Sequence, residues 1–216
     1  MDPKSRLEKE RLEGKQKRII EMVEAADRVF ARKGLEKTTM QDIADEASIG
    51  IATLFRYFPK KDRIIVAVAA KSLESNLVVF QEVLDKPGTC YEKIEHLFDT
   101  FIAFNEQKES RIKFIESFET YVAQSTEPFE GMEVYNAASK QLVDIYYKII
   151  ETGKTDGSIR TDIPITDTLS TLSNVFGIFA KKLSLHRSIL MLESKVPSET
   201  QLLILKNIFL SYIKND

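Results

Sequence analysis

The stretch KTTMQDIADEASIGIATLFRYFPKK, residues Lys37–Lys61, carries the most informative pattern in this chain. Its first half predicts a short amphipathic helix. Thr39 and Asp42 have the spacing of a capping box, in which two side chains satisfy backbone N–H groups at a helix start. The apolar residues that follow recur at the helical positions i, i+3, i+4 and i+7: Met40, Ile43, Ala44 and Ala47.

A second short helix follows a break at Ser48-Ile49-Gly50. We expect Gly50 to let the chain turn sharply where a Cβ would resist. Pro59 ends the second helix. Two helices of about two turns each, joined by a turn of three to four residues, form a helix-turn-helix. The apolar positions of the second helix are Ile51, Leu54, Phe55 and Phe58.

The outward face of this second helix suits a DNA reader. It carries no acidic residue, and Lys60 and Lys61 follow it directly. Residues at the start of such a helix can reach base edges, while neighbouring hydroxyl and ammonium groups hold phosphates. The pattern alone fits an ordinary helical hairpin equally well. The residues left at or near the outside are Ile51, Ala52, Thr53, Phe55, Arg56 and Tyr57.

The segment resembles the DNA-binding domain of the TetR/AcrR family of one-component transcriptional regulators. The family pattern is roughly Thr-x-x-x-Ile-Ala, a turn, then Thr-Leu-Tyr-x-x-Phe-x-x-Lys. This chain matches it from Thr39 to Ala44 and from Thr53 to Lys61, and the resemblance covers residues 16–76. Three positions depart from the usual Gly, Ser and Tyr: Ser48, Gly50 and Phe55.

These departures have separate consequences. The turn stays workable at Ser48 and Gly50, although it is capped differently. Phe55 lacks a hydroxyl group that commonly contacts the operator in the family. The resemblance therefore leaves one DNA contact open.

The resemblance implies a DNA-binding regulator, most often a repressor. Such a protein binds a palindromic double-stranded operator as a homodimer and is released by a small-molecule effector. We expect four residues near base edges: Gln41, Ile51, Ala52 and Thr53. We expect three residues at phosphates: Thr39, Tyr57 and Lys61. Phe55 lies on the same predicted surface.

Composition bounds the class of protein. Of 216 residues, 43% are hydrophobic and 30% are charged, which predicts a soluble protein with a substantial core. The net charge of −2 is uneven, because residues 1–63 carry 15 basic and 12 acidic side chains and residues 64–216 carry 16 and 21. DNA binding must therefore come from the placement of charge rather than from its amount.

The sequence also bears on compartment. The lone Cys90 leaves no disulfide framework and favours the reducing cytoplasm. The longest apolar run, residues 64–70, is far shorter than the ~20 residues that span a bilayer. The N-terminal stretch shows no apolar signal-peptide region. We therefore expect a cytoplasmic protein that does not enter the membrane.

The remaining chain reads as helices separated by short breaks, so we predict an all-α fold. We expect a polar N-terminal extension over residues 1–15, partly frayed, and a first firm helix over 17–34 that Gly34 ends. The DNA-binding domain covers 16–76, with its helix-turn-helix motif at 39–58. A long helix from Asp62, at the N-cap position, to about Leu84 joins it to a larger effector-binding and dimerisation domain over 77–216.

No catalytic or metal site is expected. Cys90 and His96 lie six residues apart across a helix start, which is not the geometry of a nucleophile and its base. The second histidine is His186, and no Cys/His spacing suits a metal. We predict neither a cofactor nor an enzymatic activity. Two rival hypotheses are a helical protein-interaction module without DNA binding and an enzyme of unknown class.

The middle helices are rich in aromatic residues, which could simply fill the core. The resemblance implies that some of them line an apolar effector cavity. The residues expected there are Phe98, Phe101, Phe118, Tyr121, Tyr146 and Phe176. The sequence does not identify the effector.

The last two helices, expected over 165–187 and 198–213, follow a break at 153–164. The second is apolar around most of its circumference, which favours burial against a symmetric copy. We predict a four-helix dimer interface from these helices. Its expected residues are Phe176, Gly177, Ala180, Leu202, Leu205 and Phe209.

Overall fold

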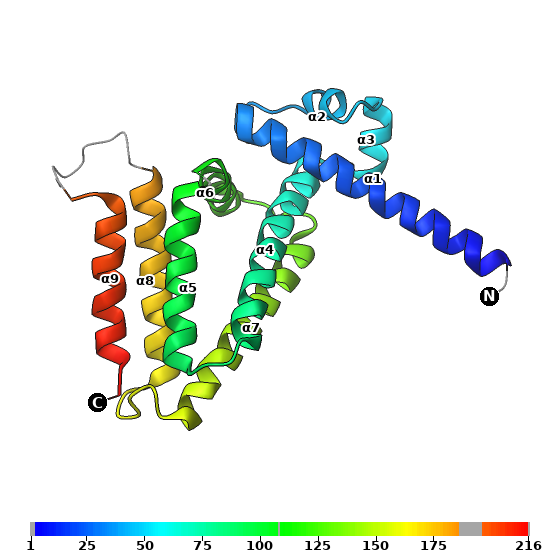
Figure 1. The fold of residues 1–216 in the computed structure, drawn as a ribbon. Helices are drawn as coiled ribbons and strands as arrows, with labels where there is room; N and C mark the ends of the chain where they lie inside the picture. Colours follow the sequence, from blue (N-terminus) through cyan, green and yellow to red (C-terminus); the bar gives the residue numbers. More distant parts are fainter. Residues whose placement is uncertain (1–2, 108, 186–195, 216) are drawn as a thin grey trace. The chain divides into compact units, whose positions relative to one another are not determined.

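The computed structural model describes residues 3–107, 109–185 and 196–215 (Figure 1). These residues form helices and no strand, with one isolated backbone bridge between Ile159 and Lys214. The predicted all-α fold is confirmed. The helices are α1 (Pro3–Lys33), α2 (Met40–Glu46), α3 (Ile51–Tyr57), α4 (Lys61–Asp85), α5 (Cys90–Gln107), α6 (Glu109–Gln124), α7 (Met132–Asp156), α8 (Ile165–Leu185) and α9 (Ser198–Ile213).

Helix α1 is longer than the sequence predicted, because the polar extension is helical rather than frayed. Its exposed charges pair across one turn, with Arg6 Nε 3.1 Å from Glu10 Oε1. Such i,i+4 pairs stabilise a solvated helix by a few tenths of a kcal/mol each. Gly34 ends the helix as predicted, at φ 79°, where its N–H bonds to the Phe30 carbonyl at 2.8 Å.

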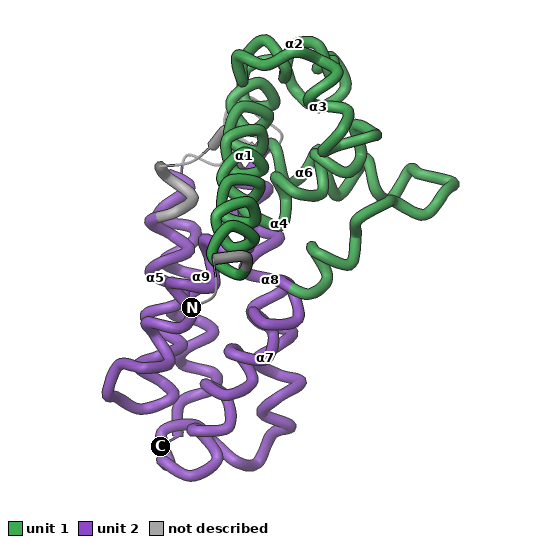
Figure 2. Tube along the Cα trace, turned by 90° about the vertical axis from the view of Figure 1, so that its right-hand side faces the viewer, with its two compact units in different colours: residues 1–72, 114–137 green, residues 73–113, 138–216 purple. Residues whose placement is uncertain are grey.

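The chain divides into two compact units (Figure 2). Unit 1 contains residues 1–72 and 114–137, and unit 2 contains residues 73–113 and 138–216. The boundaries of these units differ from those of the predicted domains. Phe114 and Phe118 fall in the predicted domain 77–216 but are buried in the core of unit 1. The ring of Phe114 stacks on Phe30 with centroids 5.7 Å apart. The functional division at residue 76 remains a prediction.

The core of unit 1 supports α2 and α3. Ile43 of α2 and Leu54 of α3 are fully buried beside apolar residues of α1 and of the first turns of α4. Burial of each such side chain stabilises the fold by about 1.5–3 kcal/mol. The helix α4 begins at Lys61, so Asp62 lies within its first turn rather than at the predicted N-cap.

Helix α4 carries a long apolar stretch. By length and composition alone it is the one helix among the described residues that could cross a bilayer. However, 44% of that stretch is buried within the protein. Ile64, Ile65 and Val66 belong to the core of unit 1, as expected of an internal helix of a folded domain.

In unit 2, α5, α8 and α9 run side by side (Figure 1). The sequence placed a break at Gly153, but α7 continues to Asp156. Gly153 is buried, and a Cβ added to it would lie 2.9 Å from Cys90 Sγ. Glycine is therefore required here for the close approach of α7 to α5. The break begins instead at Gly157, whose φ is 69°.

Candidate functional site

The start of α2 is held by the predicted capping box. The Thr39 N–H donates to Asp42 Oδ2 at 2.9 Å, and the Asp42 N–H donates to Thr39 Oγ1 at 3.1 Å. Lys33 Nζ donates to Asp42 Oδ1 at 2.5 Å. The Lys33 hydrogen bond, followed by those of Thr39, lowers the pKa of Asp42 to about 2. This carboxylate is therefore ionised at every physiological pH and fixes the entry to the motif.

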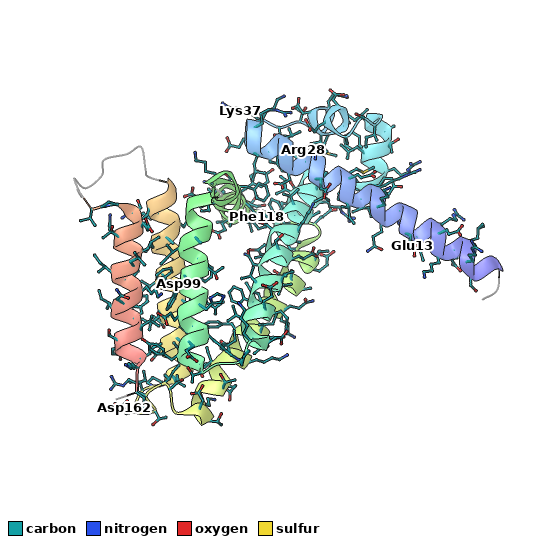
Figure 3. All side chains as sticks on the ribbon, viewed as in Figure 1. Glu13, Arg28, Lys37, Asp99, Phe118 and Asp162 are labelled. Atoms are coloured by element: carbon teal, nitrogen blue, oxygen red, sulfur yellow. The ribbon has the colours of Figure 1, made fainter. Side chains whose placement is uncertain are left out.

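Charged side chains also tie α1 to α2. Arg28, labelled in Figure 3, donates from Nε to Glu46 Oε1 at 2.7 Å, and Arg32 Nη2 donates to Glu46 Oε2 at 3.0 Å. The two hydrogen bonds lower the pKa of Glu46. The angle of α2 on α1 is thus set by ion pairs outside and by Ile43 inside.

The prediction that Gly50 provides the sharp turn is wrong. Gly50 has φ −66° and ψ 139°, which any residue adopts, and no atom lies within 4 Å of an added Cβ. Ser48 is the residue in the left-handed region, with φ 53°. A residue with a Cβ pays about 1–2 kcal/mol in this conformation. The strain of the turn lies where the resembling family usually has glycine.

Helix α3 presents a surface without acidic residues. Leu54 and Phe58 point into the core, whereas Ala52 and Arg56 are exposed and Phe55 retains 43% of its accessible surface. The stretch from residue 47 to residue 61 contains no Asp or Glu. The expected residues Ile51, Thr53 and Tyr57 are half-buried at the edges of this surface.

The surrounding polar residues have partners within the chain. The exposed Gln41 donates from its amide to Asp45 Oδ1 at 2.7 Å. Lys61, expected at phosphate, is half-buried, and its Nζ donates to the Leu35 carbonyl at 2.5 Å. Burial lowers the pKa of Lys61. This lysine therefore closes the loop after α1, and its phosphate contact remains a prediction.

Sequence reasoning missed Glu130, which lies between α6 and α7. Its Oε2 accepts from Arg63 Nε at 2.9 Å, and its Oε1 pairs with Lys60. These hydrogen bonds lower the pKa of Glu130 and raise that of Lys60. The pairing joins residues 70 positions apart in sequence, so no local pattern could have indicated it.

Unit 2 contains a cavity of about 300 Å³. Three of the six predicted pocket residues line it: Phe98, Phe101 and Tyr146. Phe176 is fully buried directly behind Phe98, with ring centroids 4.6 Å apart. The full set of described lining residues is Phe80, Ile94, Leu97, Phe98, Phe101, Leu142, Val143, Tyr146, Tyr147, Ser170, Ser173 and Asn174.

The other two predicted pocket residues belong to unit 1. Phe118, labelled in Figure 3, packs on Tyr135 with ring centroids 5.0 Å apart. Tyr121 packs on Phe129 at 5.2 Å, and its hydroxyl lies 3.5 Å from Asp62 Oδ1. These two residues do not line the cavity of unit 2.

Two serines on the polar side of the cavity, Ser170 and Ser173, were missed by sequence reasoning. Tyr146 donates its hydroxyl to the Leu169 carbonyl at 2.8 Å and lies 2.5 Å from Ser173 Oγ. Burial raises the pKa of Tyr146 to about 12, so this hydroxyl stays neutral. The available signal was the spacing of small polar residues at i, i+3 and i+4 on α8: Ser170, Ser173 and Asn174.

The structure changes which residues of α8 and α9 can meet another chain. Four of the six predicted interface residues are buried inside unit 2: Phe176, Ala180, Leu202 and Phe209. They were chosen because they are apolar, but they face their own core. Leu205 is half-buried and Gly177 is exposed. The exposed apolar residues of these helices are Val175, Ile178, Leu203, Ile204, Ile208 and Tyr212.

The nucleophilic and metal-binding residue types are dispersed. Cys90 is buried, and this burial raises its pKa to about 11. His96 is exposed, with Nε2 3.4 Å from Lys86 Nζ. No group of three or more His, Cys, Asp or Glu residues is placed to hold a metal within the described part of the chain. His186 lies outside the described residues.

A family model described as bacterial regulatory proteins, tetR family, matches residues 22–68. The transcriptional repressor KstR2 of Mycolicibacterium smegmatis is 26% identical over 145 residues, which are 67% of this chain and 69% of that protein. The matched residues include the whole of α2 and α3.

Two solved structures share the fold of the chain. A transcriptional regulator from Saccharomonospora viridis in complex with choline has a TM-score of 0.71 at 17% identity, covering 93% of this chain and 100% of that one. The regulator FadR from Bacillus subtilis in complex with stearoyl-CoA has a TM-score of 0.63 at 16% identity, covering 90% and 98%. At this level of identity, the two structures show that the chain shares their fold.

Residues 22–68 of the chain therefore match the tetR family of bacterial regulatory proteins, and together with the similarity to transcriptional repressors this match supports a DNA-binding transcriptional regulator.

Proposed function

We propose that this protein is a cytoplasmic, ligand-responsive repressor that binds a palindromic operator as a homodimer and leaves it when a small molecule occupies unit 2. The observation that carries the proposal is the surface of α3. Its buried residue Leu54 anchors a two-turn helix whose outer face is free of negative charge. The similarity to a transcriptional repressor supports repression rather than activation.

In this proposal the N-terminal half of α3 enters the major groove. Gln41, Ile51, Ala52 and Thr53 lie near base edges, and Phe55 makes apolar contact. Thr39, Tyr57 and Lys61 hold phosphates. Lys60 and Arg63 share Glu130, so phosphate competes with this carboxylate for two cations beside α3.

The homodimer forms through the exposed apolar faces of α8 and α9. Ile178 retains 70% of its accessible surface and Ile208 retains 57%, which is unusual for large aliphatic residues of adjacent helices. A two-fold interface buries such faces against their own copies. The substitution Ile178→Asp combined with Ile208→Asp should give a monomer by light scattering. Leu12→Asp, at an exposed position of α1, is the matched control and should leave a dimer.

The effector binds the cavity of unit 2. Both solved relatives described above hold a small molecule, choline in one case and stearoyl-CoA in the other. Three residues separate the end of α3 from the start of α4, and α4 contributes Phe80 to the cavity wall. A ligand shifts the protein away from DNA only if it binds the non-DNA state more tightly than the DNA-binding state.

Selection of duplexes from a random pool by the purified protein tests the proposal. We expect an enriched palindrome whose half-sites lie about 10–10.5 base pairs apart, or a multiple of that spacing. Absence of any enriched sequence at low salt would instead favour a protein-interaction module.

Two substitutions then separate the contact types on the selected operator. Lys61→Ala should weaken binding to all sequences alike and reduce the salt slope by about 1. Thr53→Ala should instead alter base preference at one position of each half-site. Sequence-selective weakening by Lys61→Ala would remove its assignment to phosphate.

A further inference from the structure

We infer that the effector is an uncharged, mostly apolar molecule with hydroxyl or carbonyl groups along one edge. This inference rests on the proposed function, because it assigns the effector to the cavity of unit 2. The two ligands named in the similar structures differ greatly in chemistry. The shared fold therefore leaves the class of ligand open, and the lining residues decide it.

Helices α4 and α5 form the cavity wall that contacts the apolar body of the ligand. Phe80 of α4 and Ile94, Leu97, Phe98 and Phe101 of α5 form this wall. None of the described residues that line the cavity is acidic or basic. An ion transferred from water to such a site without a counter-charge loses several kcal/mol of hydration that nothing there replaces.

Two acidic residues of α5 are already paired with a lysine of α9. Asp99, labelled in Figure 3, follows the lining residue Phe98 in sequence, but its Oδ1 lies 2.5 Å from Lys206 Nζ of α9. Glu95 Oε1 lies 3.3 Å from the same nitrogen. The Lys206 side chain is only 9% exposed. These carboxylates therefore balance a buried lysine and are not free to receive a cationic ligand.

The polar edge of the cavity comes from α8. Ser170, Ser173 and Asn174 lie on one stripe of this helix, and the first and last are about 6 Å apart along its axis. Hydroxyl and amide groups both donate and accept hydrogen bonds, which suits neutral oxygen groups. Tyr146, which stays protonated, orients Ser173 at a separation of 2.5 Å.

The test is titration calorimetry of the full chain at neutral pH with three probes of one shape. The probes are para-butylphenol, which is neutral, para-butylbenzoate, which is an anion, and para-butylbenzyl-trimethylammonium, which is a cation. We expect the phenol to bind at least about tenfold more tightly than either ion, a difference of about 1.4 kcal/mol. Equal or tighter binding of an ion, or no binding of the phenol at millimolar concentration, overturns the inference.

A matched pair of variants locates the site. Val143 lines the cavity and is 44% exposed, and Val134, also on α7, is 52% exposed and belongs to unit 1. Val143→Lys should raise benzoate affinity at least about tenfold, whereas Val134→Lys should leave it unchanged. Equal responses of the two variants contradict the assignment.

Operator DNA separates this inference from the proposed function. If the phenol binds as expected but never releases a selected operator, the class of ligand stands and the ligand-release proposal fails. If an ion binds more tightly and releases the operator, the proposed function stands and the uncharged class fails.

Discussion

Units 1 and 2 use the same kind of amphipathic helix for opposite purposes. In unit 1, Leu54 and Phe58 fill the space beneath α3, so that the functional groups stand outside on a packed support. In unit 2, Phe98 packs against Phe176 on one side and leaves a cavity of about 300 Å³ on the other. A surface site therefore depends on complete packing behind it, whereas an internal site depends on a space that the packing leaves unfilled.

The ion pairs of the two units differ in how exposed they are to solvent. Around the DNA-binding segment the ion pairs are exposed, as with Arg28 and Arg32 at Glu46. Exposed pairs contribute about 0–1 kcal/mol each and can exchange for phosphate. In unit 2, the Lys206 pair with Asp99 is largely buried on the lysine side. It fixes α9 to α5 and keeps charge out of the cavity wall.

The largest expected effect tests the support beneath α3. Leu54→Ala removes a fully buried side chain and should reduce the free energy of unfolding by about 2–5 kcal/mol. Phe55→Ala, at a neighbouring exposed position, should change it by no more than about 0.5 kcal/mol. Urea denaturation followed by circular dichroism measures both. Similar losses for the two variants would contradict the assignment of inner and outer faces.

A smaller effect is expected in unit 2, where packing is tight around Cys90. Gly153→Ala places a Cβ 2.9 Å from Cys90 Sγ and should reduce the free energy of unfolding by about 1–3 kcal/mol. Gly14→Ala is the matched control, because nothing lies within 4 Å of its added Cβ. It should gain up to about 1 kcal/mol from helix propensity. Stabilisation by both substitutions would show that α7 and α5 can separate without loss.

The turn between α2 and α3 provides a still smaller test. Ser48→Gly should stabilise the chain by about 1 kcal/mol, because glycine adopts the positive φ of this position without steric cost. Gly50→Ser should add only a few tenths of a kcal/mol through a new N-cap for α3. Thermal unfolding of the two variants compares them directly. A larger gain in stability from Gly50→Ser than from Ser48→Gly would contradict the assignment of backbone strain to Ser48.

The smallest expected effect concerns pH. Because the folded pKa of Asp42 lies at about 2, below its ordinary value of 3.8, its ionised form stabilises the fold above pH 3.8. This contribution is lost as the pH falls through about 2. The difference in unfolding free energy between the wild type and Asp42→Asn should therefore shrink between these limits. A difference that stays constant would mean that the capping box does not depend on the carboxylate charge.

Local chemistry made the DNA-binding segment predictable. The capping box at Thr39, the end of α1 at Gly34 and the buried position of Leu54 depend on residues a few positions apart. The turn was misassigned because glycine is favoured at positive φ, yet the chain places Ser48 there. Residue preference describes which backbone conformations are low in energy for that residue, but the surrounding fold determines which conformation it adopts.

Long-range packing made the rest unpredictable. Phe98 and Phe118 both lie on the apolar stripe of a predicted helix. Phe98 lines the cavity, whereas Phe118 fills the core of unit 1. Glu130 reaches Lys60 across 70 positions. On α8 and α9 the apolar residues were recognised, but the mutual packing of α5, α8 and α9 determines which of them face inward, as Phe209 does, and which face outward, as Ile208 does.

Cleavage of DNA by a reagent attached to α3 tests whether this helix enters the duplex. Ala52→Cys introduces an exposed thiol that can carry an iron chelate, while Cys90 is buried with its pKa raised to about 11 and stays unreactive. Val78→Cys, at an exposed position of unit 2, is the control. On a selected operator, the Ala52 derivative should cut at two positions about 34–36 Å apart, or a multiple of that distance. Cleavage that is absent, uniform along the duplex, or equal for both derivatives would contradict the paired insertion of α3 into DNA.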